Sequence, residues 1–174
     1  MVLSWGGPTI RIWKCLADGT LPERNTWKVM PEIVNGTTQL NTEEGETTEA
    51  IDEDGNVVDV LKKASKFTLA FTLFGKKGDK KPIADVDGVI EAEYGIEVTP
   101  HDPNCIGIRM DKCRVSVVET FTAADGVYWA YTFSGLKPTG GNICKHVVNG
   151  EVVPESDEEQ VSDSEEPKET GGGN

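Results

Sequence analysis

Alternation of apolar and polar residues is the clearest pattern along this chain. Three segments have the period of two that an extended strand requires: KFTLAFTLF (residues 66–74), VIEAEYGIEV (89–98) and GVYWAYTF (126–133). One side of each segment is apolar, and its members are Phe67, Leu69, Phe71 and Leu73, then Ile90, Ala92, Tyr94, Ile96 and Val98, then Val127, Trp129, Tyr131 and Phe133. The pattern predicts half-buried strands with a hydrophobic core on one face only.

Turn sequences separate these strands, as in an antiparallel sheet. They are GKKGDKKP (75–82), TPHDPN (99–104) and AADG (123–126), and Asp125-Gly126 supplies the left-handed position of a hairpin turn. Helical periodicity is short everywhere, although DVLKKASK (59–66) and KPIADVDG (81–88) each have room for a turn or two. The sequence therefore predicts a mainly β fold, an antiparallel β-sandwich or barrel, with at most one short flanking helix.

Charge divides the chain into two parts. Residues 151–174 hold nine acids and one lysine, so residues 1–150 carry about −5 of the net −13. The segment from Glu151 onward also lacks aromatic residues and ends in glycines, so it cannot bury enough apolar area to offset its ordering entropy. We expect one domain over residues 1–150 and a flexible acidic tail over 151–174.

Composition argues against several classes of protein. An acidic domain is unsuited to neutralising phosphates, which disfavours a nucleic-acid binder. The N-terminus MVLSWGGPTIRIWKC has no basic start before an apolar core, and no apolar run approaches the length of a bilayer span. Four well-separated cysteines do not make a disulfide scaffold. We expect a cytosolic protein with reduced, mostly structural cysteines and no membrane contact.

Catalytic and metal-binding patterns are weak. A zinc shell can be drawn on paper from His101, Cys105, Cys113, Cys144 and His146, but there is no CxxC pair, so core cysteines are the favoured interpretation. The DEDG at 52–55 lacks the calcium-loop register, and residue 63, where the loop needs glutamate, is lysine. Glu91, Glu93 and Glu97 alternate on one strand, which is the pattern of an exposed face and not of a catalytic pair. We therefore predict no enzyme activity, no metal and no cofactor.

The segment TTQLNTEEGETTEAIDEDGNVVDV (37–60) is strongly acidic, and neither a catalytic nor a metal-binding role accounts for its charge. It gathers seven carboxylates within residues 43–54 without one cation. Self-repulsion opposes compaction in a monomer, but in a ring such a hairpin would line a shared channel that polyphosphate passes without sticking. A solubilising loop is the alternative.

Several phrases, in a consistent order, resemble the major tail tube proteins of tailed bacteriophages and related contractile-injection tubes. They are SWGGPTIRIWK, TWKVMPEIV, GTTQLNTEEGETTEA, DEDGN, VVDVLKKASKFTLAFTLF, PIADVDGVIEAEYGIEVTPHDPNCIGIRM and RVSVVETFTAADGVYWAYTFSGLKPTGG. They span most of residues 4–148. The acidic tail has no counterpart in the family pattern, and the fold is shared by phage and secretion tubes.

The resemblance implies a β-sandwich with a small flanking helix, assembled as stacked hexameric rings whose inner sheets join into one continuous β-barrel. It makes 37–59 a long hairpin that reaches the neighbouring ring. The implied lumen or inter-ring residues are Gln39, Asn41, Glu43, Glu44, Glu46, Glu49, Asp52, Glu53, Asp54, Glu91, Glu93 and Glu97. Charge complementarity suggests Lys76, Lys77, Lys80 and Lys81 as their partners on the next ring.

The same resemblance implies where the protein acts and with what. The partners would be further copies of the chain, together with tape measure, tail terminator and baseplate or sheath proteins, while the genome passes without specific binding. The locations would be the host cytoplasm during assembly and then the virion tail. A secretion-system inner tube is the variant of this interpretation that the sequence leaves open.

A carbohydrate- or protein-binding β-sandwich is the alternative from another class. Its binding platform would use Tyr128, Trp129 and Tyr131 on the last hairpin, or Trp5 and Trp13 near the start. The shared face of Val127, Trp129 and Phe133 favours a packed core instead.

Overall fold

The computed structural model describes residues 6–154, which are mainly antiparallel strands. The strands are β1 (Thr9–Lys14), β2 (Lys28–Val29), β3 (Gln39–Glu43), β4 (Thr47–Ile51), β5 (Val57–Lys62), β6 (Lys66–Gly75), β7 (Val89–Thr99), β8 (Gly107–Thr122), β9 (Gly126–Gly135), β10 (Lys145–Val148) and β11 (Glu151–Val152). A single 3-10 turn, η1 (Arg24–Thr26), is the one helical element of this part of the chain. The mainly β antiparallel prediction is confirmed.

The predicted flanking helix is wrong for both segments named from the sequence. Residues 59–62 lie within β5, paired with β4, because the β-branched residues before them favour an extended strand. Residues 81–88 form an irregular connection that ends in a bridge between Val86 and Val89. Gly88 is in the left-handed region there, at φ 83°, which helix geometry does not allow.

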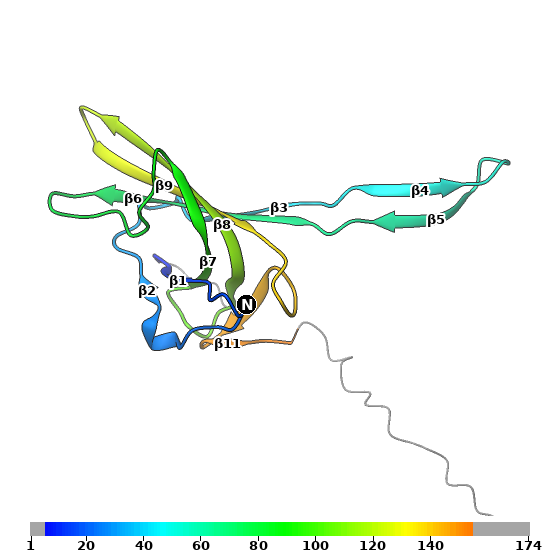
Figure 1. The fold of residues 1–174 in the computed structure, drawn as a ribbon, viewed down its shortest axis with the longest axis horizontal. Helices are drawn as coiled ribbons and strands as arrows, with labels where there is room; N and C mark the ends of the chain where they lie inside the picture. Colours follow the sequence, from blue (N-terminus) through cyan, green and yellow to red (C-terminus); the bar gives the residue numbers. More distant parts are fainter. Residues whose placement is uncertain (1–5, 155–174) are drawn as a thin grey trace, which may run out of the picture.

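One large sheet makes up the body of the molecule (Figure 1). Its strand order is β2-β1-β7-β8-β9-β6-β3, with β10 pairing the start of β8 and β11 pairing β10. Strands β4 and β5 form a separate two-stranded sheet that extends far from the body (Figure 1). The chain thus divides into a compact body and a projecting hairpin.

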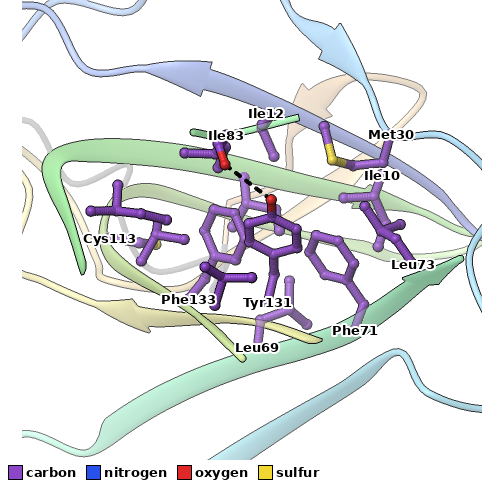
Figure 2. Close-up of a cluster of buried hydrophobic side chains, with 14 of the residues drawn as sticks. Ile10, Ile12, Met30, Leu69, Phe71, Leu73, Ile83, Cys113, Tyr131 and Phe133 are labelled. Carbon is purple, nitrogen blue, oxygen red and sulfur yellow. Dashed lines mark hydrogen bonds between the residues drawn. The ribbon is translucent and has the colours of Figure 1, made fainter. Parts of the chain in front are cut away.

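The hydrophobic core lies on one face of the sheet. The sheet is curled, so strands near its two ends contribute side chains to the same core. Ile10 and Ile12 of β1 pack into the same cluster as Leu69, Phe71 and Leu73 of β6, although three strands separate β1 from β6. Figure 2 shows these side chains converging around Phe133 and Tyr131. The Tyr131 hydroxyl donates a hydrogen bond to the Ile83 carbonyl oxygen at 3.1 Å. That bond ties the 76–88 connection over the core.

The segment after β2 closes the gap between the two ends of the curled sheet. Met30 N donates to Ile10 O at 2.8 Å on the β1 side, and Val34 N donates to Thr72 O at 2.9 Å on the β6 side. Ile33 also bridges to Leu73. The body is therefore nearly a closed barrel, held shut by one crossing segment.

The strand and turn predictions are confirmed where alternation was strongest. Leu69, Phe71, Leu73, Trp129, Tyr131 and Phe133 are all buried, as their shared side predicts. Strands β8 and β9 form the predicted hairpin, with Gly126 at φ 82°. The tail was predicted over residues 151–174, but Glu151 and Val152 form β11, so the folded part extends past residue 150. The rest of the predicted tail, residues 155–174, lies outside the described residues.

Candidate assembly surface

The acidic segment is a long hairpin arm, which we define as residues 44–65. Strand β3 leads into it from its pairing with β6, then β4 and β5 pair with each other, and β6 returns to the body. At its base the two strands approach so closely that a Cβ on Gly45 would lie 1.9 Å from the Lys63 carbonyl oxygen. The predicted hairpin of 37–59 is thus found, but it extends along the return strand to residue 65.

Lysines of the return strand lie opposite the first acids of the arm. Glu44 pairs with Lys62, Glu46 with Lys63 at 2.6 Å, and Glu43 with Lys66 at 4.0 Å. The Lys62 ammonium holds the pKa of the Glu44 carboxyl below its usual range. The charge excess in the sequence is therefore partly balanced within the chain by cations that come later in the sequence.

The tip of the arm is a tight turn built around Asp52. Its Oδ1 accepts from Asp54 N at 3.0 Å and Asn56 N at 2.8 Å, which lowers the pKa of the carboxyl. The Asp52 side chain is therefore used in shaping the turn. Glu49, Glu53 and Asp54 have no cation within salt-bridge distance among residues 6–154.

The acids predicted on β7 do not share one exposed face, which corrects the sequence prediction. Glu91 is exposed, whereas Glu93 is half-buried and pairs with Lys112 at 3.3 Å and Arg114 at 3.8 Å. Glu97 is fully buried, at 0% exposure. Two register shifts in the pairing of β7 with β8 interrupt the simple alternation. Glu97 therefore cannot line a channel.

Glu97 is buried because a second layer covers this part of the sheet. Arg24 from η1 donates to both carboxylate oxygens, at 2.8 and 2.5 Å, and the Arg109 Nη1 lies 3.8 Å away. Trp27 stacks on Trp13 at 4.0 Å between ring centroids, and the Arg24 guanidinium lies over the Trp27 ring. The connection from β1 to β2 thus covers the outer face of β1, β7 and the start of β8.

Two of the four lysines proposed as inter-ring partners have partners in their own chain. Lys76 pairs with Glu32, and Lys81 pairs with Asp85 at 2.8 Å and Glu119 at 2.9 Å. Lys81 holds the pKa of the Asp85 carboxyl below its usual range, helped by the Gly88 N–H. Lys81 therefore fastens the 76–88 connection to β8. Within residues 6–154, Lys77 and Lys80 have no acid within salt-bridge distance.

The aromatic platform of the alternative interpretation is buried. Trp129 and Tyr131 face the core, and Trp13 is covered by Trp27. Tyr128 lies on the other face of β9, beside Phe74. Trp5 lies outside the described residues. Among residues 6–154, the predicted platforms therefore offer one partly exposed tyrosine, Tyr128, for stacking.

A neutral polar face, which the sequence analysis missed, covers four neighbouring strands. Its cross-strand rows are Gln39–Ala70–Thr132–Ser116, Thr72–Ala130–Val118 and Phe74–Tyr128–Thr120, with Asn41–Thr68–Ser134–Arg114 at one end. The charges at that end are paired, Arg114 with Glu93 and Lys66 with Glu43. Gln39 and Asn41 lie on this face, and Glu43 lies at its charged end. Register across strands, which alternation alone cannot give, brings the hydroxyl residues together.

Both outer strands of this four-stranded region have an open edge among residues 6–154. Strand β3 pairs only with β6. Strand β8 pairs with β7 as far as Ser116, and beyond that it pairs only with β9. Val118 and Phe121, which belong to this open stretch, have exposed side chains. Unpaired edges with apolar side chains are templates for adding another strand.

Two thiols in the described part of the chain have a raised pKa. Burial raises the pKa of the Cys113 thiol, and burial with nearby Glu93 raises that of Cys15, so neither is activated as a nucleophile. No group of three or more potential metal ligands occurs among residues 6–154. Within the same residues, no helix has the length and apolar character needed to cross a bilayer.

A scan against protein-family models and a search of curated proteins give no match to this chain.

Proposed function

We propose that this chain is a structural subunit that assembles side by side into rings, which stack into a tube of the kind formed by bacteriophage tail tube proteins. The observation that carries the proposal is the pair of open edges, β3 and the distal half of β8, at opposite sides of one four-stranded region. An edge-to-edge contact between them is heterologous, so it either closes into a ring or continues as a filament.

Strand direction supports this contact. Each neighbouring pair from β8 through β9 and β6 to β3 is antiparallel. Strand β3 of one copy would therefore run antiparallel to β8 of the next, and the ladder would continue without a break. The cross-strand rows place β3 opposite residues 114–116 of β8 in the same chain, before the open stretch of β8 begins. Pairing of β3 with the open stretch of the next copy would therefore stagger neighbouring copies along the strands, as closure into a barrel requires.

The neutral face is the surface suited to line the bore. The core occupies one face of these strands, so only the opposite face is left for a lumen. Threonine, serine and alanine side chains there offer phosphate neither a cation nor repulsion at short range. Passage with little friction would follow from this neutrality, and acids on β7 are not needed for it. The resemblance to tail tube proteins adds that the cargo would be a phage genome.

Electron microscopy of concentrated protein tests the proposal. We expect rings or tubes from the parent chain and none from a Val118→Lys/Phe121→Lys variant, because lysine at a strand edge opposes pairing. A Leu16→Lys variant, altered at another exposed apolar position, should assemble normally. A parent chain that stays monomeric at every concentration and ionic strength would refute the proposal, and so would normal rings from the edge variant.

A charge placed on the neutral face tests its role as the lining. Thr132→Lys should still assemble, since Thr132 does not face the core, but its tubes should retain inorganic polyphosphate in a salt-dependent way. The measurement is co-sedimentation of polyphosphate with tubes at about 50 and 200 mM salt. An Asn25→Lys variant, exposed on η1, is the matched control. Equal retention of polyphosphate by both variants would show that the neutral face does not line the bore.

A further inference from the structure

The chain contains the tripeptide Val-Asn-Gly at residues 34–36 and again at residues 148–150. An asparagine followed by glycine can modify itself, because the glycine nitrogen is able to attack the side-chain amide carbon of the asparagine. Glycine has no Cβ to hinder that approach. Asn35 and Asn149 are both exposed and have the same immediate neighbours in sequence, so a difference in their reactivity has to come from the fold.

The reaction needs water and no other reagent. The Gly36 nitrogen loses its proton and forms a bond to Asn35 Cγ, and the side-chain nitrogen leaves as ammonia. The cyclic succinimide that results takes up a water molecule and opens to aspartate or to isoaspartate. In isoaspartate the main chain runs through the side-chain carbons, so the backbone becomes one atom longer.

The fold restrains Asn149 on several sides. Asn149 N donates a hydrogen bond to Pro103 O at 3.2 Å, and Asn149 Nδ2 donates to Asn104 Oδ1 at 3.4 Å. Asn149 and Gly150 have φ values of 52° and 84°, as in a tight two-residue hairpin turn, and β10 and β11 pair on either side of them. A Cβ on Gly150 would lie 3.0 Å from Arg24 Cζ, so the guanidinium crowds this peptide. Ring closure at Asn149 would therefore have to break several contacts.

Asn35 is much less restrained by the described part of the chain. Within residues 6–154 its side chain makes no hydrogen bond, and no atom lies within 4 Å of a Cβ placed on Gly36. Both residues line a groove of about 850 Å³. Gly36 has φ 76°, which fits a type II turn closed by Thr37 N donating to Val34 O at 3.2 Å. The Asn35 amide is therefore free to rotate toward the Gly36 nitrogen, the close approach that the reaction requires.

The turn that contains Asn35 is fastened at both ends to one residue of β6. Val34 N donates to Thr72 O at 2.9 Å, and Thr72 N donates to Thr37 Oγ1 at 3.1 Å. Thr37 Oγ1 also donates to Val34 O at 2.7 Å. The backbone between Val34 and Thr37 thus has a length that matches its two anchors. This turn belongs to the segment that closes the curled sheet, so a longer backbone there would weaken the closure.

We propose that Asn35 is a site of spontaneous deamidation in the folded protein, that the fold protects Asn149 from the same reaction, and that isoaspartate at residue 35 loosens the closure between β1 and β6. The closure therefore weakens as the protein ages. This inference goes beyond the proposed function and does not depend on assembly into rings.

Peptide mapping by mass spectrometry tests the difference between the two asparagines. The full-length chain is kept in mildly alkaline buffer, and conversion of Asn35 and Asn149 to aspartate and isoaspartate is followed over time. We expect Asn35 to convert about tenfold faster than Asn149, which corresponds to a barrier about 1.4 kcal/mol lower. In guanidinium chloride the two rates should become nearly equal, because the unfolded chain leaves the same tripeptide at both places.

Equal rates in the folded chain would overturn the proposal, and so would an Asn35 that stays intact while the unfolded chain reacts. Asn35→Gln is the matched control, since the longer side chain does not form the succinimide. This variant should abolish conversion at residue 35 and leave the rate at Asn149 unchanged.

Hydrogen exchange tests the effect on the closure. In chains with isoaspartate at residue 35, the Val34 and Thr72 amide protons should exchange faster than in a freshly prepared Asn35→Asp variant, which has the added charge but the normal backbone. Amide protons that pair β8 with β9 should exchange at the same rate in both chains. If the Val34 and Thr72 amides also exchanged equally in both, the loosening of the closure would be refuted.

Discussion

Replacing Glu97 with alanine is expected to lower the free energy of unfolding by about 3 kcal/mol, near the lower end of the cost of removing one partner from a buried ion pair. Glu97 is fully buried, and its loss leaves Arg109, which is 12% exposed, next to an empty site. Arg24 is 40% exposed and can regain water, which keeps the loss from being larger. Urea denaturation measures the difference.

The matched control is Glu91→Ala, on the same strand. Glu91 is exposed, so its removal should change the free energy of unfolding by no more than about 0.5 kcal/mol. If both variants lost the same small amount, the layer formed by Arg24, Trp27 and Glu97 would not be a fixed part of the fold. The connection from β1 to β2 would then be a loose cover over the sheet.

Replacing Phe71 with alanine is expected to cost about 3–5 kcal/mol, the range for a buried phenylalanine. Phe71 is 1% exposed and stacks on both Tyr131 and Phe133, with ring centroids 5.9 and 5.7 Å apart. Its removal opens a cavity in the core cluster that β6 and β9 share with β1. The midpoint of thermal or urea unfolding measures the loss.

Phe121→Ala is the control, because Phe121 also lies on a strand but is 73% exposed. We expect its stability to stay within about 0.5 kcal/mol of the parent. The same variant should weaken assembly, since Phe121 stands at the open edge of β8. A large loss of monomer stability from Phe121→Ala would mean that this residue packs within its own chain and does not belong to a joint.

The sequence by itself determined the class of fold and the core-facing side of β6 and β9. In β6 and β9 the side chain of every second residue is apolar, and the strand period alone assigns Leu69, Phe71, Trp129 and Phe133 to one face. The hairpin at Asp125-Gly126 and the acidic hairpin were also predictable, because a left-handed glycine and a run of polar residues between strands are local signals.

Tertiary structure alone decided which acids are exposed and which residues of different strands share a face. Glu97 has the same alternation as Glu91, yet Arg24, seventy-three residues earlier in the chain, covers it. The neutral face joins residues of β3, β6, β8 and β9 through cross-strand register, which depends on pairing between distant segments. The physical reason is that alternation determines only which face of its strand a side chain occupies. The residues beside that side chain on other strands, and those that cover it, depend on how distant segments of the chain pair and pack.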